Sequence, residues 1–307
     1  MPNTIELATK MCGELDKAIV QKAVTGHMVD NNLRAKFIGA KTVQIPEMDL
    51  SGLGDYDRDE GYATGTVGVS CTEYTLKMDR GRSFQLDKET ADESGVADLA
   101  GQIMGEFLRT QVAPELDAYT LSGLHKTAEG KGNVTAATLG TLEADCYKLF
   151  NTALMNAQAE YGFGDTEMVA YINPTFWAAL NNSTAFMRQI VNSDFKKGEV
   201  NTHVKSINGC TLLPVSAARM KTEYLFNNGT AEDQLSGGFT PAEGAKNIAF
   251  LLLPKSVGGL IKKTEVPRIF SPTVYQKANA WKIDYRIYYD VLIKNRDKGL
   301  IFSCTLD

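Results

Sequence analysis

The chain has 307 residues, of which 43% are hydrophobic and 22% are charged, and its formal net charge is −5. This composition is that of an ordinary globular protein with enough apolar residues for one large or two small cores. The acidic balance argues against a protein that wraps nucleic acid with a basic face, because neutralising phosphates needs clustered Lys and Arg.

The sequence shows no sign of membrane insertion or secretion. Its longest apolar run, residues 248–254 (IAFLLLP), is far shorter than the roughly 20 residues that span a bilayer, and it suits a buried strand. The N-terminus lacks the charged and apolar regions of a signal peptide. The five cysteines are scattered and odd in number, which favours reduced thiols over a disulfide framework or a zinc site. We therefore expect a soluble, intracellular protein.

The first predicted element is an amphipathic helix over residues 4–24. Apolar side chains recur there at helical spacing, and Gly26 is expected to end the helix. An N-terminal helix with an apolar face needs a surface to lie on, either in its own domain or on a neighbouring chain.

Residues 46–88 are predicted to form a long two-stranded arm. A short strand at 41–45 is expected to stop at Pro46, and a Gly- and Asp-rich stretch follows it. After a possible turn at 79–81, residues 82–86 are expected either to pair back onto the preceding strand or to extend onward from it. Because an isolated hairpin is only marginally stable in water, the arm should be stable mainly when it lies on another surface.

Within this arm, residues 66–78 alternate like a strand but change phase. The apolar positions are odd-numbered up to Cys71 and even-numbered from Tyr74 onward. Such a change of face indicates a bulge or a strong twist in a long strand.

Residues 91–124 are predicted to form one long amphipathic helix, because apolar side chains recur there at steps of three and four. Thr90 and Glu93 fit a capping box at its start. Pro114 removes one intrahelical hydrogen bond and should bend the helix near residues 109–110. Such a helix would be about 50 Å long, far beyond the average globular helix, so we interpret it as a strut.

The rest of the chain mixes helices and strands without a strict βαβ rhythm, which indicates the α+β class. A flexible connection is expected at 125–135. The last strand is expected to begin at Trp281 and to be turned back by residues 297–299. The other predicted elements are a helix at 139–161, buried strands at 167–172 and 247–253, a short helix that starts at Asn173-Pro174, and a hairpin at 204–215 around the Asn208-Gly209 turn.

The acidic stretch at 55–61 invites a calcium-loop interpretation. In such a loop a glycine stands at position six and a bidentate Glu at position twelve. Counted from Asp55, Gly61 stands at position seven and Thr66 at position twelve. We therefore expect a solvated acidic turn in place of a metal site.

No catalytic, cofactor or metal site is discernible elsewhere. The three histidines, His27, His125 and His203, each stand alone in a polar stretch, and we expect them at the surface. The sequence has no nucleophile elbow, no phosphate-binding loop and no dinucleotide fingerprint. We therefore expect a protein that is not an enzyme, and a hydrolase with an unrecognised site is an alternative.

A family resemblance rests on four stretches of the sequence. These are 48–62 (MDLSGLGDYDRDEGY), 78–87 (MDRGRSFQLD), 112–119 (VAPELDAY) and 281–293 (WKIDYRIYYDVLI). In content and order they resemble the major capsid proteins of tailed double-stranded DNA bacteriophages, in particular those that infect low-GC Gram-positive bacteria. The resemblance covers most of the chain and implies an α+β phage capsid fold.

The resemblance also implies a division of the chain into the parts of that fold. These would be an N-terminal arm (1–42), an extended loop (43–89), the spine helix of the peripheral domain (90–125), the axial domain (126–260) and the return strands of the peripheral domain (261–307).

The implied function is structural. The protein would self-assemble through pentamers and hexamers into an icosahedral shell that encloses the phage genome without specific DNA binding and without a membrane. It would be assembled in the host cytoplasm and reside in the virion capsid, with a portal and a scaffolding protein as partners. Because the chain begins directly with the arm helix, we expect a separate scaffolding protein or none. The alternative is an encapsulin, a cellular nanocompartment shell of the same fold that carries enzyme cargo.

Subunit contacts are expected on the extended loop and at the acidic cap of the spine helix. Basic side chains on the loop would face acidic side chains at the cap and set the register between subunits. Unpaired, solvated charges are the competing interpretation. The predicted interface residues are Tyr56, Arg58, Tyr62, Arg80, Arg82, Lys88, Asp92, Glu93 and Asp98.

Overall fold

The computed structural model describes residues 23–29, 35–39, 41–59, 61–88, 103–161, 167–183, 191–197, 200–264, 268–275 and 277–306. The predicted helix over 4–24 lies almost wholly outside these residues. Residues 91–102 of the predicted strut and the capping box of Thr90 and Glu93 also lie outside them.

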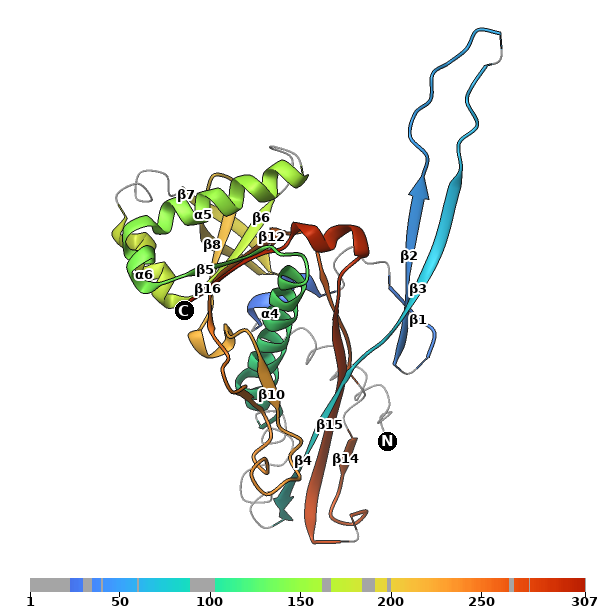
Figure 1. Ribbon diagram of the computed structural model, residues 1–307. Coiled ribbons are helices and arrows are strands. Elements are labelled where there is room, and N and C mark those ends of the chain that lie inside the picture. The colour runs from blue at the N-terminus through green and yellow to red at the C-terminus, as the bar shows by residue number, and fades with distance from the viewer. Residues whose placement is uncertain are drawn as a thin grey trace.

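The described residues form four sheets, two of which make up the body of the molecule (Figure 1). A seven-stranded sheet has the order β5-β16-β12-β6-β9-β8-β7, and in a four-stranded sheet β15 pairs with β13 and β14 along one edge and with β4 along the other. The two smaller sheets are β1-β2-β3 and β10-β11. The strands are β1 (Lys36–Phe37), β2 (Thr42–Leu50), β3 (Val67–Thr75), β4 (Met78–Asp87), β5 (Val134–Ala137), β6 (Met168–Ile172), β7 (Val191–Lys197), β8 (Val200–Ile207), β9 (Cys210–Pro214), β10 (Tyr224–Phe226), β11 (Phe239–Pro241), β12 (Asn247–Pro254), β13 (Gly259–Thr264), β14 (Arg268–Phe270), β15 (Ala280–Leu292) and β16 (Phe302–Leu306).

The central strands β6 and β12 of the seven-stranded sheet are buried on both faces. Alternate residues of β6 and β12 pack on one side against α5 (Leu139–Tyr161) and α6 (Pro174–Asn182). The others pack on the opposite side against α4 (Ala113–Glu129) and the inner face of β15. A strand buried on both faces has no polar side to show, which explains the continuous apolar run at 248–254.

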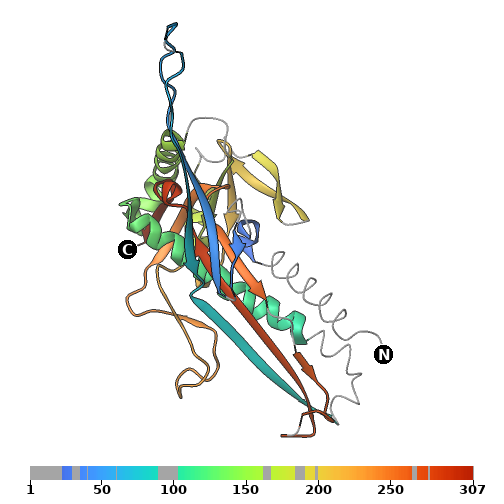
Figure 2. The same cartoon turned by 90° about the vertical axis from the view of Figure 1, so that its right-hand side faces the viewer.

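The predicted strut is present from residue 103 onward as one helical stretch that continues into α4, alongside the long strands β4 and β15 (Figures 1 and 2). A π turn, η2 (Leu108–Val112), lies at the point where Pro114 was predicted to disturb the hydrogen-bonding pattern. The predicted end at residue 124 is wrong, because the helix runs to Glu129 and buries Leu124 and Ala128 in the same core.

The predicted flexible connection at 125–135 is therefore wrong. Its first part is helical and its last two residues begin β5.

The expectation of a surface position is wrong for His125, which is buried with its Nδ1 2.8 Å from Ser303 Oγ. Burial lowers the pKa of this imidazole, which favours its neutral form. His27 lies against the ring of the buried Tyr171, with ring centroids 5.9 Å apart.

Locally encoded elements agree with the sequence. The predicted helix at 139–161 and the predicted strands at 167–172 and 247–253 are α5, β6 and β12, and Asn173 caps α6 by accepting a hydrogen bond from the Thr175 amide. The β8–β9 hairpin turns at Asn208 and Gly209, both with positive φ. No helix in the described part of the chain is both long and apolar enough to cross a membrane.

The C-terminal strand pairing differs from expectation. After β15 the chain turns through η4 (Asn295–Leu300), but β16 does not pair back onto β15. It enters the seven-stranded sheet between β5 and β12. A turn signal indicates that a chain changes direction, whereas the pairing partner is decided by where its apolar side chains are buried.

We expect Phe250→Ala to lower the free energy of unfolding by about 3–5 kcal/mol. The Phe250 ring is buried, with centroids 5.5 Å from Phe150 of α5 and 5.0 Å from Phe176 of α6, so its removal leaves a cavity between the helices and the sheet. Urea denaturation of the purified protein measures the loss. Leu225→Ala, at an exposed position of β10, is the control and should cost under about 0.5 kcal/mol. Similar losses in both variants would contradict this account of the core.

Candidate functional site

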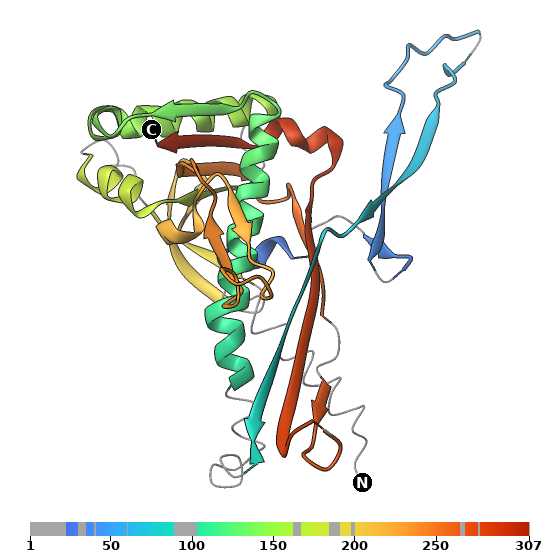
Figure 3. The ribbon, with the colours of Figure 1, turned by 60° about the horizontal axis from the view of Figure 1, so that its bottom comes forward.

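The most prominent feature of the surface is the ribbon of β2 and β3, joined by residues 51–66, which projects from the body (Figures 1 and 3). The strand β2 does not stop at Pro46 as predicted. The strand β1 pairs with β2 only at Val43 and Gln44, so among the described residues the edge of β2 beyond Gln44 has no neighbouring strand. Pro46 lies on this unpaired edge, where a proline is tolerated because its missing N–H is not needed for a sheet hydrogen bond.

The outer part of the ribbon exposes a group of large apolar side chains. Directly opposed residues of an antiparallel pair share a face, as do residues two apart. The pairs Met48↔Val69 and Leu50↔Val67 therefore form one apolar face. Their exposures are 62% for Met48, 69% for Leu50, 69% for Val67 and 63% for Val69.

The inner part of the ribbon is apolar on the opposite face. Val43 and Ile45 are buried there against the four-stranded sheet, together with Leu76, Ile261, Tyr288 and Leu292. The apolar surface of the ribbon thus changes sides between Ile45 and Met48. One face packs on the chain's own body, and the other has no apolar partner among the described residues.

This arrangement explains the phase change at 66–78, for which a bulge or a strong twist was expected, and the continuous register contradicts the bulge. The β2–β3 register runs without a shift from Thr42↔Thr75 to Leu50↔Val67. The odd-numbered apolar residues face outward, whereas Tyr74 and Leu76 face the body. The strand β3 ends at Thr75, and β4 extends onward to pair with β15.

The ribbon ends in a tight acidic turn. Asp57 and Gly61 exchange backbone hydrogen bonds of 3.1 and 2.9 Å, and Gly61 has φ of +82°. The Asp59 amide donates to Asp57 Oδ1 at 2.7 Å, so this carboxylate helps to shape the turn. Tyr56 and Tyr62 lie side by side with ring centroids 5.0 Å apart, and both are exposed. The described residues contain no group of three or more His, Cys, Asp or Glu that could hold a metal ion.

A charge cluster holds the base of the ribbon. Asp79 of β4 accepts two hydrogen bonds of 2.9 Å from Arg286 Nε and Nη2, and it also pairs with Lys41, which precedes β2. The hydrogen bonds from Arg286, followed by those from Lys41, lower the pKa of Asp79 to about 2 despite partial desolvation. Both cations also lie over the Tyr288 ring.

A second carboxylate fixes the junction between β3 and β4. Asp290 is buried and accepts hydrogen bonds from the Lys77 amide at 3.2 Å and from Tyr119 Oη at 2.8 Å. The Leu76 amide donates to the Lys41 carbonyl at 2.8 Å. The direction of the ribbon is therefore coupled to α4, which carries Tyr119.

Two of the predicted interface arginines make contacts inside the chain. Arg80 forms a bidentate ion pair with Glu115 of α4 at 2.8 and 3.1 Å, and it donates to the carbonyls of Asn227 and Gly238. Arg82 donates to the Leu235 carbonyl. Both arginines thus tie the connection between β10 and β11 to the four-stranded sheet.

The other predicted interface residues fall into two groups. Tyr56, Arg58, Tyr62 and Lys88 are exposed, and the first three lie together on the acidic turn. Asp92, Glu93 and Asp98 lie outside the described residues. Their pairing with the loop arginines stays a prediction.

Sequence reasoning missed the buried carboxylate of Asp117 on α4. It accepts hydrogen bonds from the Val24 amide at 3.0 Å, from the Thr25 amide at 2.9 Å and from Thr25 Oγ1 at 2.8 Å, and it pairs with Arg219 at 3.0 Å. The 3-10 helix η1 (Val24–Met28), which we call the N-terminal segment, is thus fastened to α4 at this point. The available signal was spacing, because Asp117 stands four residues from both Ala113 and Leu121, in a buried helical stripe.

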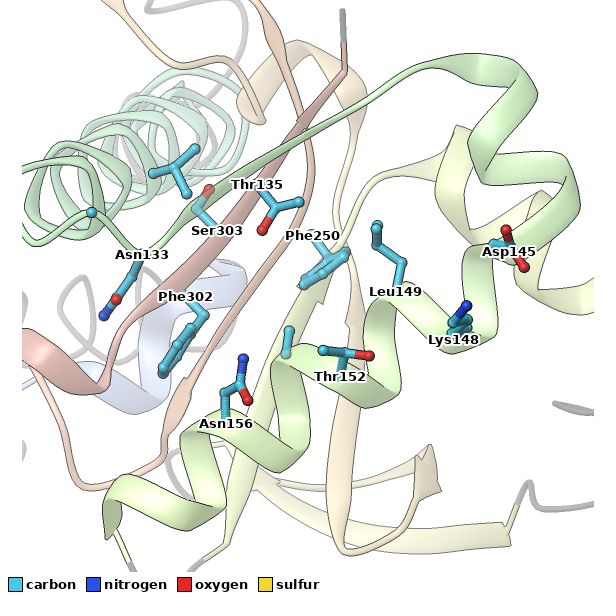
Figure 4. Close-up of a pocket in the computed structure, with 13 residues that line it drawn as sticks. Asn133, Thr135, Asp145, Lys148, Leu149, Thr152, Asn156, Phe250, Phe302 and Ser303 are labelled. Atoms are coloured by element: carbon cyan, nitrogen blue, oxygen red, sulfur yellow. The ribbon is translucent and has the colours of Figure 1, made fainter.

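A cavity of about 390 Å³ lies between α5 and the sheet strands β5, β12 and β16 (Figure 4). Asp145, at a kink inside α5, and Lys148 line one side of the cavity, and Asn156 lies further along the helix opposite Phe302 (Figure 4). Ser303 also lines the cavity, with its Oγ 2.8 Å from Nδ1 of the buried His125, and within the described residues this ring donates no hydrogen bond to a carboxylate. In the described part of the chain, this Ser–His pair therefore lacks the third group that orients the base in nucleophilic catalysis.

No protein-family profile and no curated protein matches this sequence. The structure is nevertheless similar to solved structures of capsids. The mature capsid of bacteriophage PhiM1 is 14% identical with a TM-score of 0.53, over 87% of this chain and 82% of that chain. The capsid of the cyanophage P-SCSP1u is 11% identical with a TM-score of 0.53, over 89% and 85%. The virus-like particle from Pyrococcus furiosus is 10% identical with a TM-score of 0.51, over 97% and 98%.

At these identities the likeness establishes the fold. The chain has the mixed helix-and-sheet fold of phage capsid proteins over most of its length. This confirms the fold predicted from the sequence resemblance. The subdivision into arm, loop, spine, axial and peripheral parts stays a prediction.

We expect Asp79→Asn to loosen the base of the ribbon. The variant loses the charge that holds Lys41 and Arg286, so the amides of Leu76 and Lys77 should exchange hydrogen faster than in the wild type. Because the folded-state pKa is lowered to about 2, the contribution of Asp79 is fully present above about pH 4 and is lost as the pH falls towards 2. Glu243→Gln, at an exposed position, is the control. Unchanged exchange at 76–77 in the Asp79 variant would contradict this role.

We expect Asp117→Ala to lower the free energy of unfolding by roughly 3 kcal/mol, because it leaves buried amides and Arg219 without their acceptor. Urea denaturation measures the loss, and limited proteolysis should release the N-terminal segment before the body unfolds. Asp233→Ala, at an exposed position, is the control. A loss no larger than that of the control would show that the N-terminal segment does not depend on Asp117.

Proposed function

We propose that this chain is a structural major capsid protein that self-assembles into an icosahedral shell around a phage genome. The observation that carries the proposal is the projecting ribbon with its outward apolar face of Met48, Leu50, Val67 and Val69. A continuous apolar surface on a projecting element needs a partner. In a shell built from one kind of chain, that partner is the next copy. The likeness in fold to phage capsids supports this reading.

In this proposal each subunit lays its ribbon on one neighbour and receives a ribbon from another. Such head-to-tail contacts close into rings and shells when the rotation between copies is fixed. The Asp79 and Asp290 contacts hold the ribbon at one angle to the body, which is the property that closure requires. Standard protein interfaces bury roughly 1,600 Å², and several of them per subunit make a shell difficult to dissolve.

We assign the parts of the fold with two adjustments. The seven-stranded sheet with α5 and α6 would be the axial domain, and we include β16 in it because β16 pairs with β5 and β12. The four-stranded sheet with α4 as spine would be the peripheral domain, and we include β4 in it because β4 pairs with β15. In this proposal the protein has no enzymatic role and is located in the virion capsid. A portal and a scaffolding protein would be its further partners.

A second candidate is the shell of a cellular nanocompartment. The fold likeness to the Pyrococcus furiosus virus-like particle covers 97% of this chain and 98% of that one, which favours this alternative. The contents of particles purified from the natural source distinguish the two. DNA inside supports the capsid, and a protein cargo without DNA supports the nanocompartment.

We expect the purified wild-type chain to form closed shells, visible by negative-stain microscopy, and a ribbon variant to remain unassembled. The variant changes Met48, Leu50, Val67 and Val69 to Thr, which keeps strand propensity while removing the apolar face. Its control changes Glu47, Asp49 and Ser70 on the opposite face to Thr and should still assemble.

The exposed Cys71 provides an internal reporter for this experiment. It lies on the same face as the apolar group, whereas Cys146, Cys210 and Cys304 are buried. Alkylation of the Cys71 peptide, read by mass spectrometry, should be slow in wild-type shells and fast in the ribbon variant. A wild-type chain that stays monomeric under all conditions, or a ribbon variant that assembles normally, would overturn the proposed function.

A further inference from the structure

A second cavity of about 390 Å³ lies where three parts of the chain meet. One wall is the inner face of the four-stranded sheet, and another is the helical stretch 107–115. The third wall is the connection between β10 and β11, which is tied to β4 by the two arginines described above (Figure 1). The volume falls within the range of about 300–1,000 Å³ that is usual for small-molecule sites.

Arg82 is the cation of this cavity whose charge is not matched by a carboxylate. The two carboxylates of the lining are already paired, Glu115 with Arg80 and Asp79 with the cations at the ribbon base. Arg82 is exposed, and within the described residues it donates only to the Leu235 carbonyl, at 3.3 Å from both Nη1 and Nη2. A guanidinium has five N–H donors, and its planar fork suits carboxylate and phosphate. The cavity therefore has donors to offer an anion.

Glycines keep the space beside Arg82 open. A Cβ at Gly229 would stand 3.1 Å from Arg82 Nη1, and one at Gly237 would stand 3.4 Å from the same atom. Both glycines have positive φ, at +73° and +67°, where a side chain would also strain the backbone. The connection thus approaches the guanidinium as bare main chain, which is an arrangement that proteins use where a ligand lies against the backbone.

The wall beyond Arg82 is aromatic. Arg82 and Phe84 lie two residues apart on β4, so they share one face of the strand at a separation of roughly 7 Å. The Phe107 ring lies edge-to-face with Phe84 and with Tyr285, at centroid distances of 4.9 and 5.7 Å. Gln111 lines the same side, and its exposed amide can both donate and accept hydrogen bonds. An apolar, aromatic surface with one adaptable amide therefore adjoins the cation.

We propose that this cavity binds a nucleoside monophosphate, with its phosphate on Arg82 and its base on the aromatic wall. The roughly 7 Å between Arg82 and Phe84 leaves room for the sugar that separates the two groups. Stacking on an aromatic side chain accepts any base, so Gln111 is the group that can read the edge of the base. A ligand in this position touches all three walls and so joins the sheet, the strut helix and the β10–β11 connection. This inference goes beyond the proposed function and does not depend on it.

Binding of AMP to the purified, full-length chain tests the site, with adenosine and inorganic phosphate as partial ligands. We expect AMP to bind with a dissociation constant below about 1 mM, and each partial ligand to bind at least about tenfold more weakly. Arg82→Gln should weaken AMP about tenfold and leave adenosine within about twofold, because it removes only the phosphate contact. Gln111→Leu should weaken AMP and adenosine by the same factor, about fivefold. Isothermal titration calorimetry measures AMP, and ligand-observed NMR measures the weaker ligands.

The matched control is Arg296→Gln, which removes a cation whose side chain is 77% exposed on η4, outside the cavity lining, and should bind AMP like the wild type. Circular dichroism and urea midpoints that match the wild type exclude a folding defect in the variants. The absence of AMP binding to the wild type at about 10 mM would overturn the site. Adenosine that binds as tightly as AMP, or an Arg82 variant that weakens both equally, would overturn the phosphate contact and with it the proposal.

Phosphate alone that binds as tightly as AMP would overturn the nucleoside part of the proposal. A chain that forms no shells can still bind AMP at this cavity, and a chain that forms shells can fail to bind it. Failure of this inference and failure of the proposed function are therefore distinguishable.

Discussion

The structure depends on one constraint, which is that a two-stranded ribbon has two faces and the body can cover only one of them. Val43 and Ile45 are buried on the four-stranded sheet, and further out the apolar side chains point the other way. Burying a side chain such as Met48 or Leu50 is worth about 1.5–3 kcal/mol, and this free energy is not gained within one chain. The ribbon is therefore most stable where a second surface meets its outer face.

Three carboxylates hold the parts of the chain that present this ribbon. Asp79 joins the ribbon base to β15, Asp290 joins the β3–β4 junction to α4, and Asp117 joins the N-terminal segment to α4. Each accepts hydrogen bonds from segments that are far apart in the sequence. Buried or partly buried ion pairs often add little net stability, because desolvation offsets the attraction. We interpret these contacts as fixing the angles between elements, which a repeating assembly needs to be the same in every copy.

Local patterns predicted a large part of the fold. The helix α5, the strands β6 and β12 and the β8–β9 hairpin follow from apolar spacing, a capping Asn173 and the turn at Asn208 and Gly209. The candidate site was predicted in outline, since an exposed arm with an acidic turn can be read from composition. The pattern revealed the change of apolar face but not its cause, because a phase shift looks the same whether a bulge or a second packing partner produces it. It also did not reveal the in-chain contacts of Arg80, whose partners Glu115, Asn227 and Gly238 are distant in sequence.

The sequence by itself determined the elements whose stabilising contacts are local, together with the acidic character of the turn at 55–61. Only the tertiary structure decided which strands pair. The strand β16 enters the sheet beside β12, α4 continues to Glu129, and His125 is buried against Ser303. In each case the apolar pattern is compatible with more than one neighbour. The choice is made by which arrangement buries the most apolar surface while leaving the backbone paired, and that quantity exists only once the whole chain is packed.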